Sequence, residues 1–128
     1  MQYLTIQREK QVLAKAEEIK TFLENNYQDN HDYTFLAKKF GMNTHSLSIS
    51  FRALTNSSIH EYLTKIRIER AQKLLKTTDL HVTYIAARVG LDKTNLNIHF
   101  KRHTGMTPLQ WRKKTCQNLQ ANEHNISM

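Results

Sequence analysis

The chain has 128 residues, enough for one compact domain or for two small lobes that share a connecting element. It contains only three glycines and one proline, and its apolar residues recur at helical spacing, which argues for an all-α protein. The single cysteine, Cys116, excludes a disulfide framework and fits a reducing compartment such as the cytoplasm. No apolar run approaches the ~18 residues of a membrane span, and the N-terminus lacks the apolar core of a signal peptide, so we expect neither a membrane-bound nor a secreted protein.

The net charge of +8 is unevenly distributed. Residues 1–32 carry four basic and six acidic groups, whereas residues 33–128 carry fifteen basic and five acidic groups, a net charge of +10. Such a basic region points to a polyanionic partner, and nucleic acid is the leading candidate. A solvated basic face that serves solubility is the alternative, and charge alone does not separate the two.

In chain order, residues 1–9 are expected to form a flexible lead. The first lobe is assigned to residues 10–57 and begins with an amphipathic helix from about Lys10 to Asn26. After a polar loop, helices are predicted over residues 33–40 and 44–55, on either side of Gly41. A glycine at this point supplies the left-handed cap that ends the first of the two helices, which predicts a helix-turn-helix.

A long linker helix is assigned to residues 58–77, with Ser58 and Glu61 spaced as a capping box at its start. Its apolar stripe is predicted to comprise Ile59, Tyr62, Leu63, Ile66, Arg70/Ala71, Leu74 and Leu75. The second lobe is assigned to residues 78–119 and ends in a helix that Thr107 caps and Pro108 opens. Residues 120–128 are expected to be a disordered tail.

The second lobe repeats the first at an interval of 49 residues. Sliding Gly41 onto Gly90 keeps residue class at the apolar positions, which is typical of a duplicated packing unit. The second helix of each helix-turn-helix is called the recognition helix. In the second lobe, its core-facing stripe is predicted to be Leu96, Phe100 and His103, which correspond to Leu47, Phe51 and Leu54 in the first. Tyr62 falls on Trp111. The fold predicted is all-α, with about seven helices in two helix-turn-helix subdomains joined by the linker helix.

The chain resembles the DNA-binding domain of the AraC/XylS family of bacterial transcription regulators. The matching residues, over about residues 10–115, are Leu36-Ala37-x3-Gly41-Met42, Leu47-Ser48-x2-Phe51, Tyr62-Leu63-x3-Arg67-Ile68-x2-Ala71-x2-Leu74-Leu75, Ile85-Ala86-x3-Gly90, Phe100-Lys101 and Gly105-x-Thr107-Pro108. The resemblance implies seven helices and a sequence-specific regulator of transcription, with activation as the expected role. Family members often carry an effector-binding domain, so the chain is either a small stand-alone regulator or an excised domain.

Two features depart from the family pattern. Leu91 stands where the family usually has an aromatic residue. The interval from Gly90 to Phe100 is one residue shorter than usual, and equals the interval from Gly41 to Phe51. The second recognition helix is therefore expected to start later or to be placed differently.

Helical geometry selects the DNA-facing residues once Leu47 and Phe51 are taken as buried. At about 100° per residue, the opposite face and its repeat counterpart carry His45, Ser48, Ile49 and Arg52, and Thr94, Asn97, Ile98 and Lys101. The family's base-reading positions fall on the first three residues of each set. Asn97 can bond bidentately to adenine, and the two isoleucines are expected to contact thymine methyl groups rather than to be ordinary surface apolarity. Phosphate contacts are expected from Thr44, Arg52, Lys93, Lys101 and Arg102.

Other chemistry is not expected. His99 and His103 have the spacing of a zinc pair but no evident third ligand, so neither a metal nor another cofactor is predicted. Cys116 lies near Lys113 and Lys114, yet a lone cysteine in a terminal helix is usually inert. The sequence has no Gly-rich phosphate loop, no carboxylate pair and no Ser-His-Asp set with a supporting motif, which argues against an enzyme.

The expected partner is double-stranded DNA, bound by a monomer in the cytoplasm, with RNA polymerase as a candidate second partner and no membrane. Two alternatives stay open. Few side chains on the reading faces can make bidentate base contacts, which favours a protein-interaction module that binds another regulator or RNA polymerase. The charge of the region after residue 32 favours a non-specific nucleic-acid binder.

Overall fold

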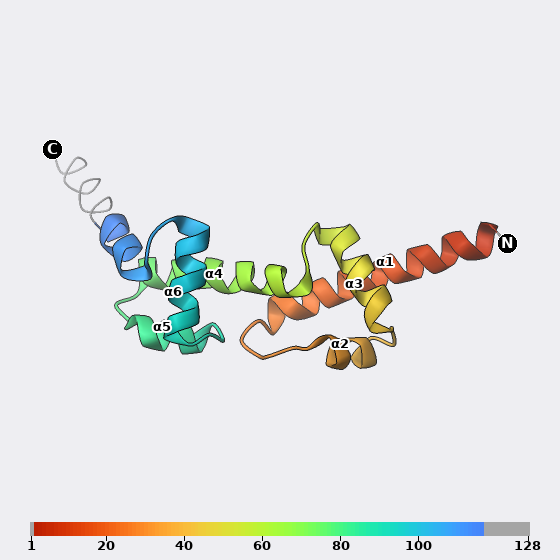
Figure 1. Cartoon of the computed structure of the whole chain (residues 1–128), viewed down its shortest axis with the longest axis horizontal. Coiled ribbons are helices and arrows are strands. Elements are labelled where there is room, and N and C mark those ends of the chain that lie inside the picture. The colour runs from red at the N-terminus through yellow and green to blue at the C-terminus, as the bar shows by residue number, and fades with distance from the viewer. Residues whose placement is uncertain (1, 117–128) are drawn as a thin grey trace. The chain divides into compact units, whose positions relative to one another are not determined.

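The computed structural model describes the backbone of residues 2–116 and the side chains of residues 6–116. These residues form helices and contain no strand, which confirms the all-α prediction (Figure 1). The labelled helices are α1 (Gln2–Asn25), α2 (Tyr33–Lys39), α3 (Thr44–Thr55), α4 (Ile59–Thr77), α5 (Val82–Arg88) and α6 (Lys93–Thr104), and residues 108–116 form the seventh. No helix in this described part is long and apolar enough to cross a membrane. The expected tail, residues 120–128, lies outside it.

The chain divides into two compact units, Met1–Ile66 and Arg67–Met128, which we call the first and the second lobe. The boundary falls inside α4. Ile59 and Leu63 belong to the core of the first lobe, whereas Ile68 and Leu75 are buried in the second. Each half of α4 is therefore a packing element of its own lobe.

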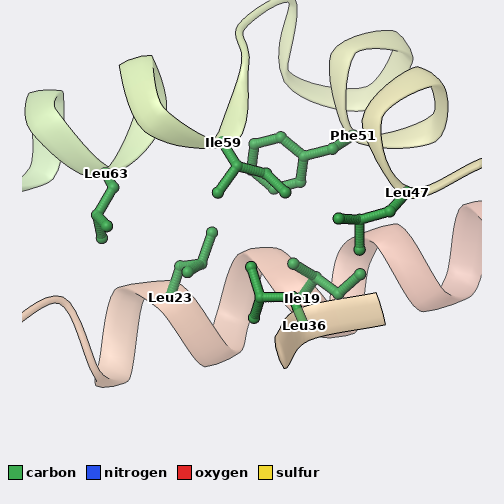
Figure 2. Close-up of a cluster of buried hydrophobic side chains, with 7 residues drawn as sticks. All are labelled: Ile19, Leu23, Leu36, Leu47, Phe51, Ile59 and Leu63. Carbon is green, nitrogen blue, oxygen red and sulfur yellow. The ribbon is translucent and has the colours of Figure 1, made fainter. Parts of the chain in front are cut away.

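The core of the first lobe is built from all four of its helices. Figure 2 shows Ile19 and Leu23 of α1, Leu36 of α2, Leu47 and Phe51 of α3, and Ile59 and Leu63 of α4 pointing toward one another. The Phe51 and Tyr62 rings meet edge to face, with centroids 5.4 Å apart. The Tyr62 hydroxyl donates to Glu24 Oε1 at 2.5 Å, which ties α4 to α1.

The second lobe uses the same arrangement of side chains around α6. Leu96 and Phe100 of α6 are fully buried, and the Phe100 and Trp111 rings meet edge to face at 5.8 Å, as the repeat predicts from Phe51 and Tyr62. Arg112 Nε and Nη2 donate to the carbonyls of Leu75 and Thr78, both at 3.1 Å. The last helix thereby satisfies carbonyl groups that the C-terminal end of α4 leaves without helical partners.

The predicted start of α1 at about Lys10 was wrong, because the helix begins at Gln2. Residues 2–9 contain no glycine or proline that would interrupt a helix. Arg8 and Val12 also border a depression that Ser50 and Ala53 of α3 line from the other side. Contact with α3 is information that a local pattern does not contain.

The single apolar stripe predicted for α4 was also wrong in part. Arg70 is exposed, whereas Ile68, which lay outside the predicted stripe, is buried. Thr64 and Arg67 are buried as well, and this burial lowers the pKa of Arg67 because it disfavours the charged guanidinium. A helix that serves two cores need not keep one stripe along its whole length.

Both recognition helices end at a residue in the left-handed conformation. Gly105 ends α6 at φ +80°, and Asn56 ends α3 at φ +62°. Among the described residues, no atom beyond its chain neighbours lies within 4 Å of a Cβ built on Gly105, so only the backbone conformation opposes a side chain there. We expect Gly105→Ala to lower the free energy of unfolding by about 1–2 kcal/mol. Gly105→Asn should lower it less, because asparagine tolerates this region. Urea denaturation measures both, and equal losses would contradict this explanation.

Candidate nucleic-acid interface

The turn before each recognition helix has the same geometry in both lobes. Gly41 and Gly90 adopt φ +65° and +89°, which a side chain would oppose. The next amide in each lobe then turns back to the preceding helix, and the Met42→Ala37 and Leu91→Ala86 hydrogen bonds both measure 2.8 Å. Each turn thereby fixes the direction in which the second helix leaves.

The start of each recognition helix is fixed by a capping side chain, as predicted. Asn43 accepts from the Ser46 amide at 2.7 Å, and Asp92 accepts from the Asn95 amide at the same distance. Both α3 and α6 have 12 residues, and they begin 49 residues apart. The two recognition helices of this chain begin at equivalent positions, because the two turns have equal length and the same hydrogen bonds. The later start or different placement expected relative to the family stays a prediction.

The end of each recognition helix is matched too. The Thr104 hydroxyl donates to the Phe100 carbonyl at 2.8 Å and accepts from the Met106 amide at 3.2 Å. The Thr55 hydroxyl makes the equivalent bonds to Phe51 and Ser57, at 2.9 and 3.3 Å. Each recognition helix is therefore held at both of its ends.

The rotation of α3 and α6 about their axes is set by their buried side chains. Leu47 and Phe51, like Leu96 and Phe100, are 0% exposed. Ile49 and Ile98 are 57% and 49% exposed, which confirms that both lie on the face opposite the buried stripe, as predicted. Two large apolar side chains therefore lie in solvent at equivalent positions.

The other predicted contact residues lie around these isoleucines. His45, Ser48 and Thr94 are exposed, and Asn97 is half-buried. The five predicted phosphate contacts, Thr44, Arg52, Lys93, Lys101 and Arg102, are all exposed. Their exposure leaves these side chains accessible to a duplex, while their roles in DNA contact remain predictions.

One side chain of the predicted core-facing stripe was assigned wrongly. His103 is exposed, and its repeat equivalent Leu54 is only half-buried. The position lies at the edge of the core. An imidazole there stays hydrated, so the protein avoids the free-energy cost of burying its polar nitrogens. Among the described residues, no group of three or more His, Cys, Asp or Glu side chains is placed to hold a metal ion.

Two cations beside α3 were not predicted from the sequence. Arg8 and Lys15 of α1 line a depression of 240 Å³ together with Asn43 and Ser46 at the start of α3. Arg8 was expected in a flexible lead, so its side chain was not assigned to a helix face. The seven-residue spacing of the two cations was the signal available.

A pair of exposed aromatic residues was also missed. Phe35 of α2 is 49% exposed and Tyr84 of α5 is 55% exposed, and the two are repeat equivalents. Extending the alignment of Gly41 on Gly90 upstream by one residue beyond Leu36 would have found them.

Two capped recognition helices, each turned in the same way on the core of its own lobe and each with a polar and basic outer face, define a double helix-turn-helix DNA-binding domain. Residues 36–114 match the helix-turn-helix domain family. The chain belongs to this family, the AraC-type DNA-binding domains of transcription regulators, so the resemblance seen in the sequence is confirmed. The family consists of DNA-binding modules and not of enzymes.

Among relatives, the chain is 39% identical over 71 residues to the HTH-type transcriptional activator RhaR of Enterobacter sp. (strain 638), a match that covers 55% of this chain and 25% of RhaR. It is 42% identical over 69 residues to RhaR of Salmonella typhi, covering 53% and 24% of the two chains. The matched region thus spans about a quarter of the length of these activators.

Among solved structures, the chain is similar to the DNA-binding domain of AdpA, a global transcriptional factor, in complex with a target DNA. The TM-score is 0.74 and the identity 29%, over 77% of this chain and 90% of that chain. It is also similar to the C-terminal domain of the two-component response regulator yesN of Fusobacterium nucleatum, with a TM-score of 0.70 and 31% identity over 76% and 97% of the chains.

The exposed isoleucines give a prediction for the interface. On a site selected by the protein, Ile49→Ala and Ile98→Ala should each weaken binding by about 1 kcal/mol or more if the side chain touches a thymine methyl group. Replacing the facing thymine by uracil should cause a similar loss, and the two losses should not add, since both remove one contact.

Fluorescence anisotropy measures the affinities, and Leu109→Ala is the matched control. Leu109 is 55% exposed and lies outside both recognition helices, so its removal should leave DNA affinity unchanged. A fall of many degrees in the melting temperature of either isoleucine variant would instead mark that isoleucine as part of the core.

Proposed function

We propose that the chain binds double-stranded DNA sequence-specifically as a monomer, with α3 and α6 inserted into adjacent major grooves. The observation that carries the proposal is the equivalence of the two reading faces. Each presents one large exposed apolar side chain, Ile49 or Ile98, on a helix whose rotation is fixed by a fully buried leucine and phenylalanine. A major groove admits one α-helix, and two equivalent helices suit two successive grooves.

The proposed roles follow from the chemistry of each side chain. His45, Ser48 and Thr94 can donate or accept single hydrogen bonds at base edges, and Asn97 can bond bidentately to adenine N7 and N6. Ile49 and Ile98 suit thymine methyl groups. Thr44, Arg52, Lys93, Lys101 and Arg102 suit phosphates, which fix the position of the protein without specifying sequence.

Activation of transcription is proposed from the relatives. RhaR is named a transcriptional activator, and the chain matches about a quarter of its length. We propose that this domain delivers an activating surface to a promoter in the cytoplasm and that RNA polymerase is the partner on that surface. Any effector-binding function would belong to other parts of such a protein.

A competition experiment tests the DNA proposal against its alternatives. A labelled duplex selected by the protein should be displaced by the same unlabelled duplex at concentrations at least ~10³-fold lower than by random duplex DNA. Equal displacement by random DNA and by RNA would indicate a non-specific nucleic-acid binder. Failure to bind any duplex would leave a protein-interaction module.

The joint use of both lobes gives a separate prediction. Two alanines inserted after Ile66, at the boundary of the lobes, should turn one lobe by about 200° relative to the other while α4 stays helical. An insertion further along would separate Ile68, Ala71 and Leu75, each of which is buried in the second lobe. Affinity should fall to that of a single lobe, and the footprint should shorten. An unchanged footprint would mean that the lobes do not engage DNA together.

A further inference from the structure

The first lobe has a cationic surface outside the reading face of α3. The depression of 240 Å³ is bordered by Arg8 and Lys15 of α1, by the turn Gly41-Met42, and by Asn43 and Ser46 of α3. Its eight lining residues include these two cations and no acidic residue. An anion entering it meets positive charge that no carboxylate of the lining offsets.

The two cations lie on one face of α1. Seven residues correspond to about 700° of helix rotation, so the side chains differ in direction by only about 20°. Lys15 is half-buried, and its Nζ donates to the Gly41 carbonyl at 3.4 Å, which holds the ammonium group beside the turn. An ammonium group has three N–H donors, so two remain for an anion. Arg8 is exposed and adds a planar donor group suited to phosphate.

The position of these two cations relative to α3 determines which part of a bound duplex they would meet. Asn43, the capping residue of α3, and Ser46 of α3 line this depression, and Ser50 and Ala53 of α3 line a second depression beside α1. On a helical wheel, this flank adjoins the reading face, because Ile49 and Ala53 differ by only about 40°. A recognition helix about 10–12 Å across fills a major groove about 12 Å wide, so sugar–phosphate backbone lies along its flanks.

We propose that Arg8 and Lys15 bind a backbone phosphate of the DNA strand that borders α3, so that α1 is part of the DNA interface. This inference rests on the proposed function, since it requires α3 to enter the groove. The contact adds affinity and fixes the position of the first lobe, but it does not distinguish one base pair from another.

The second lobe differs at the equivalent place. Asp92 replaces Asn43 as the capping residue of α6, and its carboxylate accepts from both the Asn95 amide and Asn95 Nδ2. A carboxylate stabilises the helix start but repels phosphate. The phosphate contact we propose therefore belongs to the first lobe alone.

The test uses a mixed-sequence duplex of about 30 bp, because phosphate contacts act on all sequences alike. The affinity of the full chain is measured by anisotropy over a series of KCl concentrations. If about six phosphates are neutralised, the plot of log K against log[salt] should have a slope near −5. Arg8→Gln/Lys15→Gln should flatten that slope by about 0.9, the value for one lost phosphate contact.

Lys10→Gln is the control for position. It removes one positive charge from α1, where the double variant removes two, at a position rotated by about 200° from Arg8, on the opposite face of the helix. Its slope should equal that of the wild type. Lys15→Arg, which keeps the charge, should also keep the wild-type slope.

Asn43→Asp is a second variant that retains a capping side chain. It should weaken binding several-fold at low salt by placing a carboxylate in the depression, and Asp92→Asn should strengthen binding in the other lobe. Equal slopes for the double variant and for Lys10→Gln would overturn the inference while leaving DNA binding intact. No binding by the wild-type chain would overturn the proposed function, and the inference with it.

Discussion

The structure depends on one constraint, the burial of a leucine and a phenylalanine on each recognition helix. Leu47 with Phe51, and Leu96 with Phe100, are fully buried, and each phenylalanine packs edge to face on an aromatic ring of a following helix. Fully burying an exposed isoleucine would be worth about 1.5–3 kcal/mol. Ile49 and Ile98 remain outside because a rotation that buried either of them would expose the leucine and the phenylalanine together. The reading face is thus a consequence of the core.

The duplication could be predicted because each lobe makes the same local demands on its sequence. A helix start needs a side-chain acceptor, and Asn43 and Asp92 both supply one. A left-handed helix end needs glycine or asparagine, and Gly105 and Asn56 meet that need. Residue identity changed while chemical class was kept, so the fold, the helix caps and the exposure of both isoleucines could all be predicted from helical spacing and the repeat alone.

The failed predictions concern positions whose environment comes from distant parts of the chain. Arg8 and Val12 of α1 lie beside Ser50 and Ala53 of α3, and the buried face of α4 changes where one lobe succeeds the other, as Ile68 shows. His103 matched an apolar residue in the repeat but occupies the edge of the core. Arg8 and Lys15 join the candidate interface only because α1 packs against α3. Spacing along the chain, such as the seven residues between Arg8 and Lys15, does not show which distant element a side chain faces.

The most direct test of the central claim, that two equivalent faces read DNA together, is selection of binding sites from a pool of random duplexes. Two enriched blocks are expected, with centres one helical turn, or about 10 bp, apart. Each block should include a thymine whose methyl group faces an isoleucine, and disruption of either block should lower the affinity. A single enriched block would show that only one lobe reads sequence. A pool that shows no enrichment would contradict sequence-specific binding by either reading face.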